Sequence, residues 1–290
     1  MRKKFLISTL LMVVFSLFNS SCEKKTTTSR ERTDFEAIKA IIYENPDIFL
    51  VDVYDTDKDT SVNPVFFREI TSTDFDLDSA RRYDADSLHS FARIYAAWGD
   101  SMRGTFHYFR DENEHTKPIY AHSVMDAYFE KWGYDSDSHR GWLLKKISGN
   151  VITSVDANSR ELHSLHITSS SVDTVLYRHD ILNLVRFSRW LPDKDSTLSF
   201  GMEEKITFAV KPKDTTDYLF LHVGEDGNFK KFPFSSNGDG TFSASWTTTS
   251  DPNIAKGYKH AFVDAISWKS VTDTTAEYDS KAWGIIYRIK

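Results

Sequence analysis

Cysteine is almost absent from the sequence, which contains only Cys22 in 290 residues. A single thiol cannot form a disulfide within the chain, so the fold has to be stabilised by its own packed core. Structural zinc sites built on two or more cysteines are excluded for the same reason. The sequence therefore predicts neither a disulfide framework nor a cysteine-based metal centre.

The sequence also lacks the motifs that mark common catalytic and nucleotide-binding sites. It contains no Gly-x-Ser-x-Gly elbow, no His-Glu-x-x-His pair, no P-loop and no G-x-G-x-x-G fingerprint. Basic residues are in deficit as well, with 36 Lys and Arg against 42 Asp and Glu and a net charge of -6. An acidic chain is poorly suited to nucleic acid or anionic lipid, so we expect no nucleic-acid partner and no cofactor.

The N-terminal hydrophobic run is too short to serve as a membrane span. It extends from Phe5 to Phe18, about 14 residues, whereas a helix needs roughly 20 to cross a bilayer. A basic cluster, Met1 to Lys4, precedes the run, and small polar residues, Asn19 to Ser21, follow it. Because this order is typical of an export signal, residues 1–21 are predicted to be a signal peptide.

The stretch Leu17 to Lys25, LFNSSCEKK, resembles the lipobox of bacterial lipoproteins. Ser20 and Ser21 fit that pattern, while Asn19 stands where an aliphatic residue is usual. The resemblance implies cleavage immediately before Cys22, a diacylglycerol on its sulfur, and a palmitate-type acyl chain on the new amine. Cys22 is thus the predicted lipidation site, and several acyl chains give a stable membrane anchor. The alternative is an ordinary secretory signal with an incidental cysteine.

Residues 22–33 are predicted to be a lipidated tether. The segment Glu23 to Thr33 has no apolar residue and would reach roughly 17 to 20 Å. Lipoproteins kept at an inner membrane often have Asp directly after the cysteine, and here Glu23 follows it. Lys24 and Lys25 interrupt the acidic run seen in surface-exported lipoproteins of some groups. The resemblance therefore favours the periplasm-facing outer membrane over the cell surface.

Residues 34–192 are predicted to form an α+β domain, with helices on a curved, mostly antiparallel sheet. The segment Lys117 to Trp132 fits a strand and a helix equally well, and we favour the strand because Tyr and Phe prefer a pleated, half-buried surface. The resulting element order resembles that of nuclear transport factor 2-like folds, in which a bent sheet leaves a pocket. The expected elements are helices at Asp34–Glu44 and Asp86–Trp98, and strands at Ile48–Tyr54, Val62–Ile70, Met102–Arg110, Lys117–Trp132, Trp142–Ser148, Leu162–Thr168 and Val172–Tyr177.

Residues 197–290 are predicted to form an all-β domain, separated from the first by Pro192 to Ser196. Six apolar, alternating runs in about 90 residues are typical of a β-sandwich. The turn and strand SSNGDGTFSASW resembles bacterial immunoglobulin-like and fibronectin III-like domains. The expected strands carry the sequences ITFAV, YLFLHV, FKKFPF, TFSASW, KHAFVDAISW and AWGIIYRI.

A set of polar residues offers the strongest hint of a catalytic site. On a strand, alternate residues share one face, so Tyr120, His122, Asp126 and Tyr128 are expected to lie together, with His107 facing them from a neighbouring strand. A His–Asp pair beside tyrosines is suited to acid–base chemistry in a pocket. A polar sheet face or a dimer contact is the simpler interpretation.

An acidic stretch offers a weaker hint of a metal site. Asp55, Asp57 and Asp59 have the first spacings of a calcium-binding loop. That loop also needs Gly at its sixth position and Glu at its twelfth, where this sequence has Thr60 and Phe66. A solvated acidic turn is the better interpretation, and no metal is expected.

These features together predict an exported, lipid-anchored cell-envelope protein that acts as a non-enzymatic binding or assembly module. Its expected partners are a membrane, through the lipid, and a protein or glycan in the envelope. One alternative is an α+β domain that binds a small ligand or catalyses a reaction with His122 and Asp126. Another is a glycan-binding lipoprotein, because 7 Trp and 13 Tyr supply rings on which sugars can stack.

Overall fold

The computed structural model describes residues 33–49, 59–72, 75–82, 89–96, 102–157, 159–186, 196–225 and 228–290, and all structural statements below concern these residues. The chain divides into two compact units, Met1–Thr33 and Asp34–Lys290, of which the second is described here. The predicted signal peptide, Cys22, the tether up to residue 32 and residues 192–195 of the predicted domain boundary lie outside the described residues.

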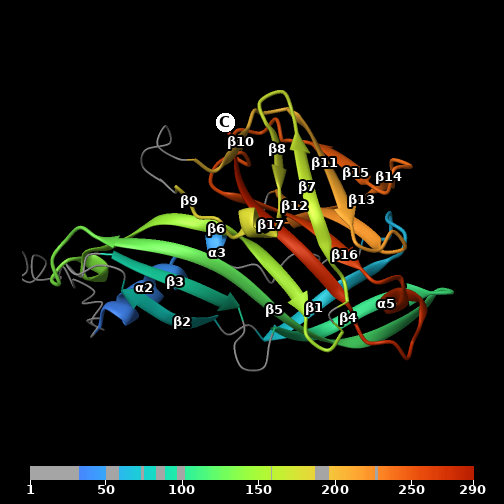
Figure 1. The fold of residues 1–290 in the computed structure, drawn as a ribbon, viewed down its shortest axis with the longest axis horizontal. Helices are drawn as coiled ribbons and strands as arrows, with labels where there is room; N and C mark the ends of the chain where they lie inside the picture. The colour runs from blue at the N-terminus through green and yellow to red at the C-terminus, as the bar shows by residue number, and fades with distance from the viewer. Residues whose placement is uncertain are drawn as a thin grey trace, which may run out of the picture. The chain divides into compact units, whose positions relative to one another are not determined.

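Twelve of the described strands form one large sheet (Figure 1). Its hydrogen-bonded order is β1-β4-β5-β6-β17-β16-β12-β13, while β3 pairs with β2 and β5, β9 with β6, and β10 in parallel with β17. The strands are β1 (Phe66–Ser72), β2 (Phe75–Arg82), β3 (His89–Ala96), β4 (Met102–Arg110), β5 (Asn113–Lys131), β6 (Trp142–Ser154), β9 (Val185–Arg186), β10 (Leu198–Phe200), β12 (Tyr218–Glu225), β13 (Asn228–Pro233), β16 (Lys259–Ile266) and β17 (Ser280–Ile289).

Five strands form a second sheet in the order β14-β15-β11-β7-β8. Its inward-facing side chains meet those of β6, β10, β12, β16 and β17 in one apolar core, so the two sheets make a sandwich. The strands are β7 (Leu162–Thr168), β8 (Asp173–Leu176), β11 (Lys205–Pro212), β14 (Ser235–Ser236) and β15 (Phe242–Thr247).

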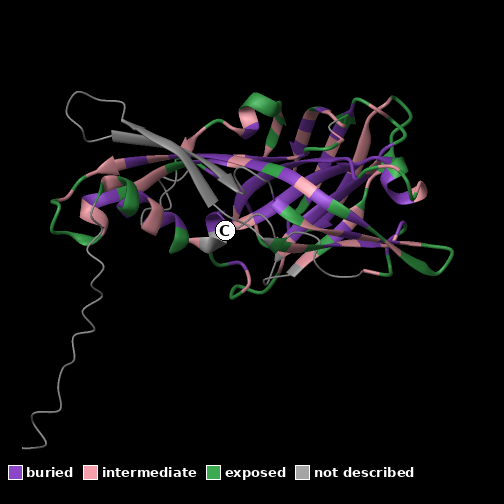
Figure 2. Ribbon diagram, turned by 90° about the horizontal axis from the view of Figure 1, so that it is seen from below, coloured by how far each residue is buried: buried purple, intermediate pink, exposed green. Residues whose placement is uncertain are grey.

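The large sheet curls, and its two ends approach each other. Lys231 in β13 donates from Nζ to the carbonyl oxygen of Phe66 in β1 at 2.6 Å, although these strands are the two ends of the pairing order. A second apolar core fills the inside of the curl and includes Phe106, Phe220 and Phe262. Strands β16 and β17 consequently face a core on both sides and are buried along nearly their whole length (Figure 2).

The helices are short and few in the described residues. α2 (Asp34–Tyr43) buries Ala37, Ile38, Ile41 and Ile42 in a third core with residues of β5 and β6, as its predicted periodicity requires. The others are α3 (Pro46–Phe49), the 3₁₀ turn η1 (Ser138–Gly141), α4 (Arg178–Ile181) and α5 (Trp268–Thr272). No helix in the part of the chain that the structure describes is long and apolar enough to cross a membrane.

The predicted fold class is wrong. An α+β domain followed by an independent immunoglobulin-like sandwich would keep the strands of residues 34–192 apart from those of 197–290. Instead β6 pairs with β17 in the large sheet, and β7 pairs with β11 in the small one. Both sheets are therefore built from both halves of the sequence. The pattern of a strand shows which faces it buries and leaves its hydrogen-bonding partner unspecified.

Individual elements were predicted better than the fold. The strand interpretation of Lys117–Trp132 is confirmed by β5, in which every odd-numbered residue from 117 to 129 is buried. The bounds of β7 and β4 match the predictions, and each of the six C-terminal runs contains a strand, although KHAFVDAISW ends in the cap and first residue of α5. The helix at Asp86–Trp98 is wrong, because β3 occupies residues 89–96 and pairs with β5. Of the predicted strand Ile48–Tyr54, its first two residues end α3 and the rest lies outside the described residues.

Candidate functional site

The polar set on β5 does not come together around a cavity. The alternation of β5 breaks at Asp126, because its register with β6 shifts there and residues 125–127 are all buried, whereas His122 is exposed and Tyr120 and Tyr128 are half-buried. Four residues of extended strand separate the Cα atoms of His122 and Asp126 by roughly 13 Å, too far for a direct His–Asp hydrogen bond. The arrangement is that of a polar sheet face.

His107 belongs to a separate local cluster. It lies opposite Thr116 in the β4–β5 register, six residues and about 20 Å along β5 from His122. Its ring stacks on Phe67 at a centroid distance of 4.3 Å, and its Nδ1 lies 2.6 Å from Glu114 Oε1. These contacts explain the position of the His107 side chain without a catalytic role.

The other predicted site residues are only partly described. Cys22, Asp55 and Asp57 lie outside the described residues. Asp59 Oδ1 accepts hydrogen bonds from the hydroxyl and the backbone N–H of Ser61, at 2.6 and 2.8 Å, and the hydroxyl is the main reason why its pKa is lowered. Among the described residues no group of three or more His, Cys, Asp or Glu side chains is placed to hold a metal ion.

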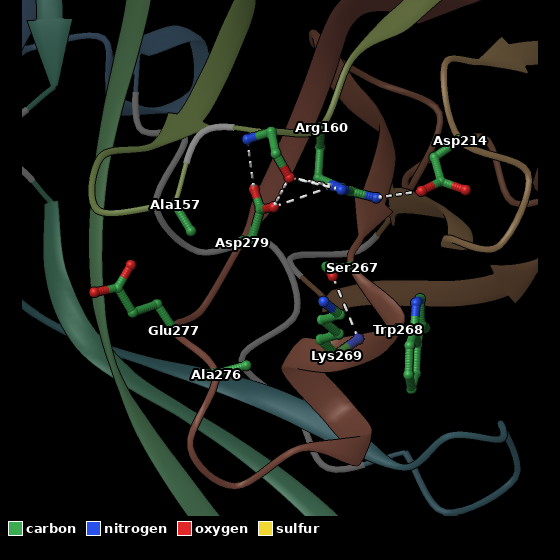
Figure 3. Close-up of a pocket in the computed structure, with 10 residues that line it drawn as sticks. Ala157, Arg160, Asp214, Ser267, Trp268, Lys269, Ala276, Glu277 and Asp279 are labelled. Carbon is green, nitrogen blue, oxygen red and sulfur yellow. Dashed lines mark hydrogen bonds and ion pairs between the residues drawn. The ribbon is translucent and has the colours of Figure 1, made fainter.

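A pocket of about 410 Å³ lies elsewhere, where four connecting segments meet (Figure 3). They are the β6–β7 connection, the β11–β12 turn, the start of α5 and the segment that enters β17. The volume falls within the usual range for small-ligand sites. None of the five polar residues predicted from β4 and β5 lines this pocket.

Arg160 joins three of these segments. Its Nε donates to Asp279 Oδ2 at 3.1 Å, its Nη1 donates to Asp214 Oδ2 at 3.2 Å and to Asp217 Oδ1, and its Nη2 donates to the Ser159 hydroxyl at 2.6 Å. Only 13% of the Arg160 side chain is exposed. A planar guanidinium with several charge-assisted hydrogen bonds holds one geometry, so this group forms a rigid floor.

The floor carries more negative than positive charge. Burial raises the pKa of Asp217 to about 6, even though the Arg160 guanidinium lowers it, and the neighbouring Asp214 and Asp279 raise it further. Three carboxylates thus surround one arginine. A site with this balance favours ligands that donate hydrogen bonds over anions.

The wall of the pocket is the first turn of α5. Ser267 caps this helix by accepting from the N–H of Lys269 at 3.3 Å, and Lys117 Nζ donates to the carbonyls of Lys269 and Asp273 at 3.3 and 2.5 Å. Both ends of the helix are therefore fixed. Trp268, with 42% of its surface exposed, therefore lines the pocket from a helix that is held at both ends.

Two charged groups on the rim have no partner in the described part of the chain. The carboxylate of Glu277 and the ammonium of Lys269 take part in no hydrogen bond or ion pair among these residues, and both line the pocket. Figure 3 places them on the same side of the floor as Ala276. The pocket thus offers an acceptor, a donor and an aromatic ring above a fixed polar base.

No local pattern in the sequence predicts this site. Arg160, Asp217 and Asp279 are each separated from the next by more than fifty residues, and they meet only because the first residues of β7, β12 and β17 lie near one another. Trp268 stands at the end of a run that was predicted to be strand throughout. Comparisons with protein-family models and with curated protein sequences found no match.

Proposed function

We propose that the protein is an exported, lipid-anchored binding protein of the bacterial envelope, and that its pocket at Arg160 and Trp268 binds a saccharide unit. The anchor is the lipidated Cys22, and the domain faces the periplasm from the outer membrane. The assignment of the anchor is supported by the lipobox-like segment, and the assignment of the ligand by the pocket.

The observation that carries the ligand assignment is the exposed Trp268 ring beside a fixed polar floor. Sugar rings combine apolar C–H faces with hydroxyl edges, so they suit a site that has an aromatic surface and orienting polar groups. Glu277 and Lys269 supply an acceptor and a donor for hydroxyl groups. The acidic excess of the floor disfavours a phosphorylated or carboxylated ligand.

Binding fits this pocket better than catalysis. Asp217 is the carboxyl group with a pKa near neutrality, but its side chain has no exposed surface and lies behind Arg160. A general acid has to reach the reacting atoms, and a sealed carboxyl cannot. Arg160 is itself engaged by three carboxylates, so it serves to shape the site.

A saccharide-binding assay tests this proposal. The mature chain would be screened against glycans from envelopes, and each ligand found would be measured by calorimetry with the wild type and Trp268→Ala. We expect Trp268→Ala to weaken binding at least tenfold, about 1.4 kcal/mol, because an aromatic anchor is lost. Trp132→Ala is the matched control, since Trp132 is also exposed and does not line the pocket.

Two results would contradict the ligand assignment: a wild type that binds no saccharide, or Trp268→Ala binding that equals that of the wild type. The anchor has a separate test. Mass analysis of the N-terminal peptide should find a triacylated Cys22, and Cys22→Ser should release the protein from membranes. An unmodified thiol or a different processed start would overturn the anchor and leave the pocket proposal standing.

A further inference from the structure

The β5–β6 connection presents the most exposed aromatic side chains of the described residues. Trp132 is 72% exposed and Tyr134 is 81% exposed, and Leu143 at the start of β6 is 46% exposed. We call these three residues the aromatic tip. Figures 1 and 2 show this connection at one end of the long β5 and β6 strands, beside α2. Exposed side chains of this size, gathered at one tip, indicate a contact surface.

The backbone under the aromatic tip is fixed. The carbonyl of Gly141 accepts from the N–H groups of Trp132 and Gly133, at 2.9 and 3.3 Å. Gly141 has φ of +78°, and a Cβ on it would lie 2.4 Å from the carbonyl carbon of Gly133, so only glycine fits. Asp137 Oδ2 also accepts from the N–H of Tyr134 at 2.8 Å. The two aromatic rings are therefore presented by a rigid turn.

The aromatic tip lies where the chain enters the folded unit. Asp34, the first residue of α2, accepts from Arg140 Nε at 2.9 Å and from Lys131 Nζ at 3.2 Å. At the other end of α2, Glu44 lies 3.0 Å from His139 Nε2. These contacts bind α2 to the connection at both ends. The N-terminal end of the described unit, at Asp34, consequently lies next to the connection that carries the aromatic tip.

The charged side chains around the aromatic tip are paired locally, so they do not favour electrostatic attraction of an anionic membrane surface. Lys131 and Arg140 are both paired with Asp135 as well as with Asp34. The Lys145 ammonium lies 3.9 Å from the centroid of the Trp132 ring, and Trp132 Nε1 donates to Glu130 Oε2 at 2.7 Å. An indole with an ammonium over its face and a hydrogen-bonded N–H at its edge is amphipathic, as the boundary between water and lipid headgroups requires.

We propose that the aromatic tip rests in the headgroup region of the bilayer that carries the lipid anchor. This inference depends on the proposed acylation of Cys22, which lies twelve residues before Asp34. A tether of that length reaches roughly 20 Å, so it keeps the tip within reach of the membrane surface. Trp and Tyr are the residues that concentrate at membrane–water interfaces, and zwitterionic lipids would accept them without basic residues.

This orientation would also direct the pocket away from the membrane. Lys117, which holds α5 and hence Trp268, lies on β5 fourteen residues before Lys131. That distance is roughly 46 Å along the strand. In Figure 1, α5 and the β5–β6 connection lie at opposite ends of β5. Bilayer contact through the tip thus leaves the pocket open to ligands in the aqueous space.

The test uses a fluorescent label on the acylated full chain. Because Cys22 would be blocked by its lipid, Tyr134→Cys supplies one reactive thiol for an environment-sensitive dye, and Trp268→Cys supplies the matched control. Each labelled protein is reconstituted in phosphatidylcholine–phosphatidylethanolamine vesicles, with and without brominated acyl chains. We expect a blue shift and strong quenching of the dye at position 134, and no change at position 268. The quenching should persist in high salt.

The possible results separate this inference from the anchor. A protein that is acylated and vesicle-bound, but whose dye at position 134 stays in water, overturns the inference alone. Dye protection that arises only when envelope proteins are added also overturns it and assigns the tip to a protein partner. A chain without lipid on Cys22 overturns the anchor and this inference together. As a label-free check, Trp132→Phe should remove the quenching of tryptophan emission by brominated lipid.

Discussion

Two arginines in this protein hold carboxylates in different surroundings. Arg68 in β1 is 1% exposed, and its Nη2 lies 2.6 Å from Asp264 Oδ2 in β16. Its Nε also donates to the Tyr278 hydroxyl at 2.8 Å. Arg160 contacts three carboxylates at the floor of the pocket. The first cluster is sealed inside the curled sheet, whereas the second borders solvent.

The sealed cluster is nearly balanced in charge. Burial raises the pKa of Asp264, but the Arg68 guanidinium and His222 lower it by more, so the carboxylate stays ionised. His222 Nε2 lies 3.3 Å from Asp264 Oδ2, and the rings of Phe66 and Phe106 lie within 6 Å of the guanidinium. A cluster of this kind joins β1 to β16 across the curl. Its counterpart at Arg160 has additional carboxylates and an opening, which are features of a ligand site.

The largest expected effect in this comparison is that of Arg68→Met. This change leaves the Asp264 carboxylate buried without its counter-charge, which should lower the free energy of unfolding by about 3 to 5 kcal/mol. Urea denaturation at pH 7 measures the loss. Adding Asp264→Leu to Arg68→Met should recover much of it, because the unpaired carboxylate is then removed as well. A loss below about 1 kcal/mol for Arg68→Met would show that the cluster is solvated.

Arg160→Met should destabilise the protein less, by about 2 to 3 kcal/mol, because water solvates the half-exposed Asp214 and because Asp217, whose pKa is already about 6, can take up a proton. The same variant should lose saccharide binding, since the floor is no longer fixed. Urea denaturation and calorimetry measure the two effects. If Arg160→Met cost as much stability as Arg68→Met, the distinction between a sealed and an open cluster would fail.

The raised pKa of Asp217 predicts that the pocket cluster makes the free energy of unfolding depend on pH. The carboxyl binds its proton more tightly in the folded chain, with a pKa of about 6 against 3.8. Its contribution to stability is therefore full below about pH 4 and is lost as the pH rises through 6, a change of about 2 to 3 kcal/mol. Asp217→Asn should remove this slope from unfolding measured between pH 4 and 7.

Asp156→Asn is the matched control for this measurement, since Asp156 is exposed in the neighbouring loop. It should retain the pH dependence of the wild type. An unchanged slope in Asp217→Asn would mean that another group is responsible, and the pocket cluster would then resemble the sealed cluster in its response to pH.

The smallest expected effect concerns a third, more exposed ion-pair cluster around Asp34. Burial raises the pKa of this carboxyl, but hydrogen bonds from Arg140, Trp142 and Lys131 lower it by more, to about 2. Its stabilisation is present above about pH 4 and is lost as the pH falls through 2. Asp34→Asn should cost about 1 kcal/mol at pH 7, after allowance for solvent screening, and nothing near pH 2. Equal losses at both pH values would contradict this assignment.

Local patterning predicted most of the helices and strands and which of their faces are buried. The apolar stripe of α2, the alternation in β5 and β7, and the C-terminal runs all follow from local periodicity, which backbone geometry imposes within each segment. The prediction of a lipidated Cys22 rests on the sequence in the same way and awaits its test. Residues 86–98 show the limit of the approach, since pairing with β5 made a strand of a segment with a helical pattern.

Strand pairing and the meeting of distant side chains depend on long-range packing. β6 pairs with β17, and Arg160 meets Asp217 and Asp279, across separations of more than fifty residues. No pattern within a segment encodes these choices, because periodicity fixes the orientation of a strand and leaves its neighbours open. The partners are selected by the packing of the whole core, so both the sandwich and its pocket exist only once distant parts of the chain have come together.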